Sequence, residues 1–165
     1  MGKWILDTCG WRRTPNLVKM AYEDIISILP YKKPFLFVDQ LLELTEEGVK
    51  GTYHIKEDEY FFEGHFPGNP IVPGVILTEI MAQVGLVSLG LFLTPEADRD
   101  KVRPAFTSAS VDFLAVASPN DELEIASKKI YFRFGKLKCN VSCRKKDGTI
   151  VAKGELSGMI VKSIE

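Results

Sequence analysis

The chain is organised around the stretch from Gly64 to Gln83, which reads GHFPGNPIVPGVILTEIMAQ. Up to Gly74 it contains three prolines and three glycines, a composition that predicts an irregular loop. Pro73 can stand at the start of a helix, because a proline in the first turn gives up only an N–H that has no partner there. The apolar run that follows, as far as about Leu93, predicts a long buried helix.

Two polar side chains interrupt this apolar run. Glu79 and Gln83 are four residues apart and therefore share one face of the helix. Their presence favours a core helix over a membrane-spanning one, although the run approaches the length of a span. A buried glutamate is costly unless it is paired or protonated, so Glu79 is a candidate functional residue. Together with His65 on the preceding loop, it gives the best functional clue in the sequence.

Length and composition are those of an ordinary globular protein. With 165 residues and 45% hydrophobic residues, the chain can form one domain with a sizeable core. A formal net charge of -1 gives no reason to expect nucleic acid as the main partner. Three cysteines without paired spacing argue against disulfides and favour a reducing cytoplasm, and no histidines lie near Cys139 and Cys143 to complete a metal site. The run Trp4-Ile5-Leu6 is too short for the core of a signal peptide.

The rest of the chain predicts an antiparallel sheet. Residues 1–20 show no clear period and are treated as an N-terminal extension, with a single domain over 21–165. A short helix is expected from Ala21 to Leu29. The strand-like stretches are Phe35–Leu44, Val49–Ile55, Ala105–Phe113, Glu122–Phe134, Leu137–Arg144 and Thr149–Lys162. The small residues Ala82, Gly85 and Ser88 let a sheet come close, so we expect an α+β fold in which the sheet wraps around the long helix.

Several segments together form a long and unusual motif: Gly64-His65-Phe66-Pro67-Gly68, Pro73-Gly74-Val75, Glu79, Met81-Ala82-Gln83 and, upstream, Pro34-Phe35-Leu36-Phe37-Val38-Asp39. This motif closely resembles the signature of the hotdog-fold 3-hydroxyacyl-[acyl-carrier-protein] dehydratases of the FabZ type. The resemblance covers about Ala21 to Ile160 and is strongest before residue 93. The related FabA type carries aspartate at the helix position, so Glu79 places this chain nearer the FabZ type.

The resemblance implies a specific active site. In that family the site forms across a dimer interface, where the histidine of one subunit faces the helix carboxylate of the other. Carried over, this gives His65 and Glu79 as the catalytic pair and the Gly74 N–H as the donor to the thioester carbonyl. The acyl chain would run in an apolar tunnel between subunits, with four candidate substrate-binding residues: Phe62, Phe66, Ile71 and Gln83. Core packing is the default alternative for the two phenylalanines. For Gln83 the alternatives are support of Glu79 or hydrogen bonds to neighbouring backbone groups, and a structural role is favoured.

Dehydration of a 3-hydroxyacyl thioester needs these three kinds of group. The reaction removes a weakly acidic proton next to the carbonyl and expels hydroxide, a poor leaving group. Neutral His65 can be the base, because imidazole titrates near working pH. Burial raises the pKa of a carboxyl group, so Glu79 can stay protonated and act as the acid. The Gly74 N–H, with the helix dipole behind it, can stabilise negative charge on the carbonyl oxygen.

The expected function is dehydration of (3R)-3-hydroxyacyl-[acyl-carrier-protein] to trans-2-enoyl-[acyl-carrier-protein] in fatty-acid or related acyl-chain biosynthesis. We expect a cytoplasmic homodimer, with a trimer of dimers left open, and neither a membrane nor nucleic acid as partner. No metal or nicotinamide is expected, because a base, an acid and an oxyanion donor suffice for the reaction and the sequence shows no cofactor motif. The substrate is expected on the phosphopantetheine arm of acyl carrier protein. Nine basic residues against one acidic residue between Lys128 and Lys153 either steer this acidic carrier or form the solvated faces of a hairpin.

Two alternatives stay open at this point. A hotdog thioesterase would use the carboxylate to activate water against the same thioester, and a non-catalytic subunit would only bind acyl groups. The chain departs from the family pattern at Asn69, where histidine is usual, in the strand beginning at Asp112, and at Phe106–Ala109. The gating tyrosine of the family also has no clear counterpart. These departures leave the reaction type in place and leave chain length and carrier preference open.

Overall fold

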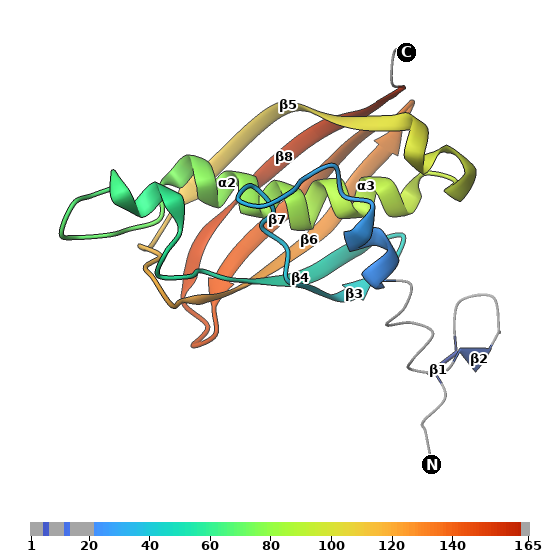
Figure 1. The fold of residues 1–165 in the computed structure, drawn as a ribbon. Helices are drawn as coiled ribbons and strands as arrows, with labels where there is room; N and C mark the ends of the chain where they lie inside the picture. The colour runs from blue at the N-terminus through green and yellow to red at the C-terminus, as the bar shows by residue number, and fades with distance from the viewer. Residues whose placement is uncertain (1–4, 7–11, 14–21, 163–165) are drawn as a thin grey trace.

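The computed structural model describes residues 5–6, 12–13 and 22–162. One antiparallel sheet has the strand order β3-β4-β6-β7-β8-β5 (Figure 1). Its strands are β3 (Gln40–Leu44), β4 (Gly48–His54), β5 (Val102–Phe113), β6 (Glu122–Arg133), β7 (Lys136–Lys145) and β8 (Ile150–Lys162). The long helix is continuous through α2 (Gly74–Ala82), the π-helical segment η2 (Gln83–Val87) and α3 (Ser88–Leu93). Two 3-10 segments flank it: η1 (Tyr60–Glu63) and η3 (Glu96–Lys101).

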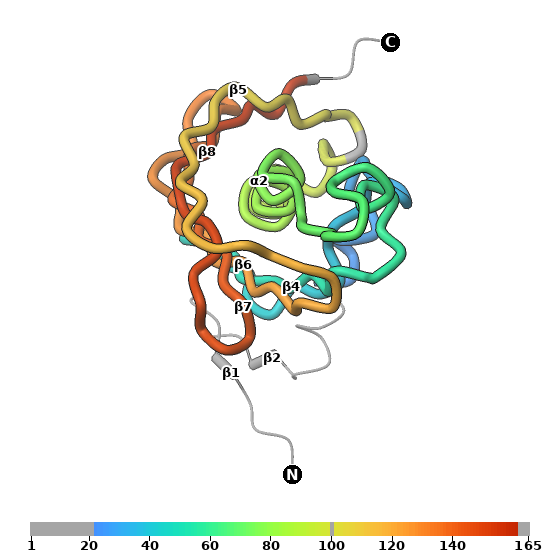
Figure 2. The backbone as a smooth tube through the Cα atoms, turned by 90° about the vertical axis from the view of Figure 1, so that its left-hand side faces the viewer, coloured from blue at the N-terminus to red at the C-terminus, as the bar shows by residue number. Residues whose placement is uncertain are grey.

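The sheet curves around the long helix, as Figure 2 shows looking along α2. Every residue from Ile80 to Leu91 is buried. The helix has the length and composition of a membrane span, yet 72% of it is buried inside the protein, so it is the core of the fold. Gly85 allows the sheet to approach, because a Cβ there would lie 2.9 Å from Val141 Cγ1 and 3.1 Å from Ser127 Cβ. This agrees with the expectation from the small residues on the helix.

The π-helical segment widens the helix in its middle. Both the backbone N–H and the hydroxyl of Ser88 donate to the carbonyl of Gln83, the hydroxyl at 2.8 Å. The wide turn therefore begins at the residue whose side chain supports Glu79. Such π-helical turns occur often at functional sites.

Most predicted elements are confirmed within one to three residues. The four strands after the helix lie where the sequence placed them, and the short first helix covers residues 22–27. Along β4 the side chains alternate as predicted: Val49 and Tyr53 are buried, whereas Lys50 and His54 are exposed. Period-two patterns of this kind identify strands well because one face is buried.

The first predicted strand is wrong in its first half. β3 begins only at Gln40, and residues 35–39 have irregular backbone. The cause is Gln83: its Oε1 accepts the Phe37 N–H at 2.8 Å, and its Nε2 donates to the Phe35 carbonyl at 2.9 Å. A helix side chain thus satisfies backbone groups that a neighbouring strand would otherwise pair. Phe37 is nevertheless fully buried, which explains the strand-like apolar pattern.

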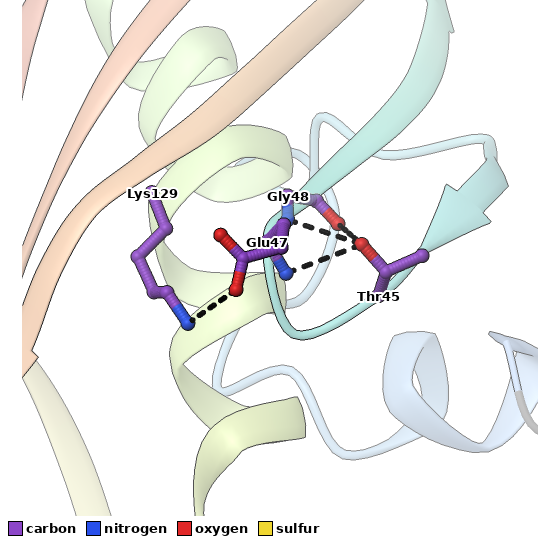
Figure 3. Close-up of polar contacts among 4 residues, drawn as sticks. All are labelled: Thr45, Glu47, Gly48 and Lys129. Atoms are coloured by element: carbon purple, nitrogen blue, oxygen red, sulfur yellow. Dashed lines mark hydrogen bonds and ion pairs between the residues drawn. The ribbon is translucent and has the colours of Figure 1, made fainter. Parts of the chain in front are cut away.

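The turn between β3 and β4 lies at Glu46-Glu47-Gly48, in the gap between the predicted stretches Phe35–Leu44 and Val49–Ile55 (Figure 3). Thr45 Oγ1 accepts the N–H groups of Glu47 and Gly48, each at 3.2 Å. Lys129 Nζ lies 3.3 Å from a carboxylate oxygen of Glu47 and ties the turn to β6. Gly48 is required here, because a Cβ would lie 2.2 Å from the Ser127 carbonyl oxygen.

Part of the N-terminal extension forms a small two-stranded sheet. In it β1 (Ile5–Leu6) pairs antiparallel with β2 (Arg12–Arg13). The sequence pattern did not predict these strands. The other residues up to 20 lie outside the described residues, so the extension's role and the domain division at residue 20 stay predictions.

β5 forms an open edge of the sheet, with β8 as its neighbour on the other side. Along this strand Phe106 and Phe113 are 49% and 51% exposed, and just beyond its end Leu114 and Val116 are 54% and 55% exposed. A long edge strand with unpaired backbone groups and exposed apolar side chains is a site for association with another chain.

We predict that Gly48→Ala lowers the free energy of unfolding by about 1–3 kcal/mol, because the new methyl group would overlap a backbone oxygen that cannot move without breaking β6. The measurement is the urea midpoint followed by circular dichroism. Gly64→Ala is the matched control, since a Cβ at Gly64 would meet nothing within 4 Å and its φ is -117°. Equal midpoints for the two variants would contradict the close approach seen at Gly48.

Candidate active site

A constrained loop between η1 and α2 carries His65. Its backbone is anchored at both ends: the His65 N–H donates to the Phe61 carbonyl at 3.0 Å, and the Ile71 N–H donates to the His65 carbonyl at 3.2 Å. The Val72 N–H donates to the Ala117 carbonyl at 2.8 Å and ties the loop to the segment that follows β5. The loop predicted from its prolines and glycines therefore holds His65 in a defined place.

The same loop fixes the protonation pattern of the His65 ring. Its Nδ1 lies 3.0 Å from the Ile71 carbonyl oxygen. A carbonyl oxygen can only accept, so we assign a proton to Nδ1, and in the neutral ring the free lone pair then lies on Nε2. The Phe66 ring stacks on the imidazole with centroids 4.0 Å apart. The half-buried imidazole is thus oriented to accept a proton on Nε2.

The helix N-terminus supplies a backbone donor. α2 begins at Gly74, and the first N–H groups of any helix have no acceptor within it. The N–H groups of Ile76 and Leu77 both donate to the Pro73 carbonyl at 3.0 Å, whereas within the described residues no acceptor pairs with the Gly74 N–H. A Cβ at Gly74 would lie 3.1 Å from the Phe113 ring, so the glycine is also needed for packing against the end of β5.

Two side chains hold the carboxyl group of Glu79. Gln83 Nε2 donates to Glu79 Oε1 at 2.8 Å, and the Tyr31 hydroxyl is near enough to the carboxyl group to lower its pKa. Gln83 is fully buried, and its amide also makes the two bonds to the backbone of Phe35 and Phe37. The amide is therefore rigidly held and fixes the position of the carboxyl group.

Burial raises the pKa of Glu79 above the ordinary range of a glutamate, and the hydrogen bonds from Gln83 and Tyr31 oppose this rise. Desolvation disfavours the charged form, whereas donors to the carboxylate favour it. Because burial is the larger effect, the protonated form of Glu79 persists to higher pH than in an exposed glutamate. A carboxyl group of this kind is able to act as a general acid.

A small, partly open cavity of about 50 Å³ borders Glu79. Its wall is formed by the long helix, by β5 and β8, and by Leu137 of β7. Glu79 and Tyr31 are its polar side chains, and the remaining lining is apolar or glycine: Leu86, Val87, Pro104, Ala105, Phe106, Leu137, Gly158, Met159 and Ile160. The lining matches an acyl chain in polarity, but a volume of about 50 Å³ is far below the roughly 300–1,000 Å³ of a ligand pocket, so the acyl tunnel between subunits stays a prediction.

The other predicted site residues lie in different surroundings. Phe62 and Phe66 border a separate open cleft near the carboxylates of Glu57 and Glu63. Ile71 lies beside His65 through its backbone, and Gln83 uses its amide on Glu79 and the chain at residues 35–37. Contact of these four residues with substrate stays a prediction.

Sequence reasoning missed Tyr31. It lies after the first helix, far from Glu79 in the chain, and its ring packs 6.4 Å from that of Phe35. Because no spacing rule links residue 31 to residue 79, only the fold brings them together. The nearest sequence signal is the position of Tyr31 just before the Lys32-Lys33-Pro34 segment that leads to the motif.

The base and the acid do not meet within one chain. Among the hydrogen bonds of the described residues none joins His65 to Glu79, and His65 does not line the Glu79 cavity. That arrangement is compatible with the expectation that the two groups come from opposite subunits, which stays a prediction.

The cysteines of β7 lie apart from this site. Cys139 and Cys143 are buried free thiols, and burial raises the pKa of both. In the part of the chain that the structure describes, no three His, Cys, Asp or Glu side chains are grouped for metal binding.

Comparisons with known proteins identify the family. A FabA-like domain matches residues 29–155. The 3-hydroxyacyl-[acyl-carrier-protein] dehydratase FabZ of Caldicellulosiruptor saccharolyticus is 41% identical over 137 residues, which cover 80% of this chain and 92% of that protein. The dehydratase of the same name from Herpetosiphon aurantiacus is 38% identical over 149 residues, covering 86% and 99%.

A solved structure supports the same fold. A chain of the dehydratase heterocomplex ApeI:P from Xenorhabdus doucetiae aligns with a TM-score of 0.71 and 15% identity over 84% of this chain and 91% of that chain. The resemblance found in the sequence and the predicted hotdog architecture are both confirmed. The chain belongs to the FabA-like family, among the hotdog-fold dehydratases of the FabZ type.

Proposed function

We propose that this protein dehydrates (3R)-3-hydroxyacyl-[acyl-carrier-protein] to trans-2-enoyl-[acyl-carrier-protein] in fatty-acid or related acyl-chain biosynthesis. The observation that carries the proposal is the Glu79 carboxyl group, held by Gln83 and raised in pKa by burial at the head of an apolar cavity. Family membership supports the same reaction, because curated relatives that match this chain over most of their length carry the dehydratase name.

The proposed reaction uses three groups. His65 Nε2 takes the proton from C2 of the acyl group, and the Gly74 N–H stabilises the negative charge that develops on the thioester oxygen. The electron pair left on C2 then forms the C2–C3 double bond as the C3–O bond breaks. Glu79 gives its proton to the departing hydroxyl, which leaves as water. The substrate is held on the phosphopantetheine arm of the carrier, and no step calls for a further cofactor.

The proposed assembly is a homodimer formed at the open edge of β5. Ala105 and Phe106 of this strand line the Glu79 cavity, and Phe113 at its other end packs on Gly74. A second copy that pairs with this edge would therefore border both the acid and the helix N-terminus. Two-fold pairing of identical edges places the same residues on both sides, so each dimer would contain two equivalent sites. A further trimer of dimers remains part of the proposal for the full assembly.

A basic hairpin tip is the proposed docking surface for the carrier. Four of the nine basic residues between Lys128 and Lys153 form ion pairs with carboxylates: Lys129, Lys138, Lys145 and Lys146. In contrast, Arg133 and Lys136 have no carboxylate partner within the described residues and flank Phe134, which is 100% exposed. Lys128, Arg144 and Lys153 also have no carboxylate partner among the described residues, and it is the exposed aromatic ring beside Arg133 and Lys136 that favours the turn between β6 and β7.

Phe134 is an unusual residue for this turn. The two turn residues, Phe134 and Gly135, have φ of 50° and 74°, the pair of positive angles that favours asparagine followed by glycine. A bulky side chain at positive φ is strained by about 1–2 kcal/mol. Since no contact in the described chain offsets this strain, an external role for the exposed ring is favoured. An aromatic ring between two cations suits an acidic carrier with apolar contact residues.

We place the protein in the cytoplasm, where such a carrier is available.

We predict that His65→Ala and Glu79→Gln each lower kcat by at least about 10²-fold, because each removes one proton-transfer group. The measurement is the ultraviolet absorbance and mass of the enoyl product from 3-hydroxyacyl carrier proteins of several lengths. His54→Ala is the control, since His54 is exposed on β4. Full turnover in either variant would mean that the roles are wrong, and release of free thiol would instead indicate a thioesterase.

Mixing the two inactive variants tests whether the pair is shared between subunits. A dimer with one His65→Ala chain and one Glu79→Gln chain would contain one intact site, so random exchange should restore about a quarter of wild-type activity. Activity is measured after joint refolding or coexpression, with each variant refolded alone as control. If both groups of one site came from the same chain, mixing would restore nothing.

Phe134→Asn is predicted to raise the KM for carrier-bound substrate about tenfold, because it removes an exposed aromatic anchor of the docking surface. The same variant should leave the kinetics with a short pantetheine thioester unchanged and should keep or raise the unfolding midpoint, since asparagine suits positive φ. Leu42→Asn, which replaces another exposed apolar residue at 49% exposure on β3, is the control. An unchanged KM for the carrier substrate would remove this hairpin tip from the docking surface.

A further inference from the structure

We propose that Tyr31 is a positioning residue of the active site, whose hydroxyl holds the Glu79 carboxyl group and faces the substrate's 3-hydroxyl in the same cavity. This inference rests on the proposed function, because it assigns a role within the dehydration step. It adds a member to the site that neither the motif nor the spacing of the sequence identifies.

The cavity composition is the first observation. Tyr31 and Glu79 are its two polar side chains, and the rest of the wall is apolar. The Tyr31 hydroxyl is near enough to the Glu79 carboxyl group to lower the pKa of the carboxyl group and to raise its own. A hydroxyl group on a substrate inside this cavity would therefore find its polar partners at this pair alone among the lining side chains. Such convergence of few polar groups in an apolar pocket is typical of sites that orient a ligand.

Tyr31 is also held in place by the same residues that hold Glu79. Its ring packs on Phe35, with centroids 6.4 Å apart and an interplanar angle of 41°. The Phe35 carbonyl accepts from Gln83 Nε2 at 2.9 Å, and the same Nε2 donates to Glu79 Oε1 at 2.8 Å. Each of four residues therefore contacts two of the others: Tyr31, Phe35, Gln83 and Glu79. A displacement of any one of them would loosen the carboxyl group.

The hydroxyl has a chemical task in the proposed step. When Glu79 gives up its proton, a carboxylate is left in a largely apolar cavity, which is unfavourable unless donors stabilise it. Gln83 supplies one donor, and the Tyr31 O–H supplies the second. Both hydrogen bonds lower the pKa of Glu79 against the rise caused by burial. Tyr31 therefore keeps the acid strong enough to protonate a poor leaving group.

Among the described residues of one chain, few titratable groups act on Glu79. Tyr31 precedes the irregular segment at residues 35–39, and Tyr60 of η1 also interacts electrostatically with Glu79. The residues of β5, β7 and β8 that line the cavity carry no titratable side chains: Pro104, Ala105, Phe106, Leu137, Gly158, Met159 and Ile160. Removal of the Tyr31 hydroxyl should therefore change the pKa of Glu79 measurably.

The test is Tyr31→Phe, which keeps the ring packed on Phe35 and removes only the hydroxyl. We expect kcat to fall about tenfold with little change in KM, because a hydrogen bond to a charged group is lost. The basic limb of the pH–rate profile should move to higher pH, since the Glu79 carboxylate loses a donor and its pKa rises further. Carboxyl ¹³C NMR titration of the free protein should show the same upward shift without any turnover.

Tyr22→Phe is the matched control, because Tyr22 also packs partly buried against the core near the first helix. It should leave the pH–rate profile unchanged. An unmoved basic limb together with an unmoved NMR titration in Tyr31→Phe would overturn the inference, as would loss of the fold, which would make the hydroxyl a structural group. Absence of dehydration by the wild-type protein would instead overturn the proposed function, and the NMR titration would still decide the role of Tyr31.

Discussion

The structure depends on a buried amide that cannot be left without partners. Gln83 belongs to the long helix and its side chain is fully buried, so an amide without hydrogen-bond partners there would cost several kilocalories per mole. Its oxygen accepts a hydrogen bond from the Phe37 N–H, and its nitrogen donates to the Phe35 carbonyl and to Glu79 Oε1. One side chain thereby joins the segment before β3 to the helix and orients the carboxyl group. Fold stability and acid placement rest on the same three hydrogen bonds.

Much of the fold could be predicted because its patterns are local. The long apolar run gave the helix, alternation gave β4 and the strands after the helix, and the prolines and glycines of residues 64–74 gave the loop of His65. The segment 35–39 could not be predicted, because buried Phe37 looks the same in sequence whether its N–H pairs with a strand or with Gln83. Local patterns state which side chains are buried, not which group satisfies the backbone.

The candidate site divides in the same way. His65, Gly74 and Glu79 were identified by their motif, and the structure adds the physical reasons for their proposed roles: the assigned ring tautomer, the unpaired helix N–H and the desolvated carboxyl group. Tyr31 was not predicted, because it lies far from Glu79 in the sequence and only the folded chain brings the two side chains together. The basic stretch at Lys128–Lys153 was visible in sequence, yet only the structure shows which of its lysines are paired with carboxylates.

The open edge of β5 has a consequence for how this protein works at different concentrations. If acid and base are divided between two copies, as proposed, a solitary chain contains two halves of different sites and no complete one. Specific activity per milligram would then fall on dilution below the dissociation constant of the pair, with every chain still correctly folded. The quantity of protein in the cell, and not only its sequence, would decide whether a catalyst exists.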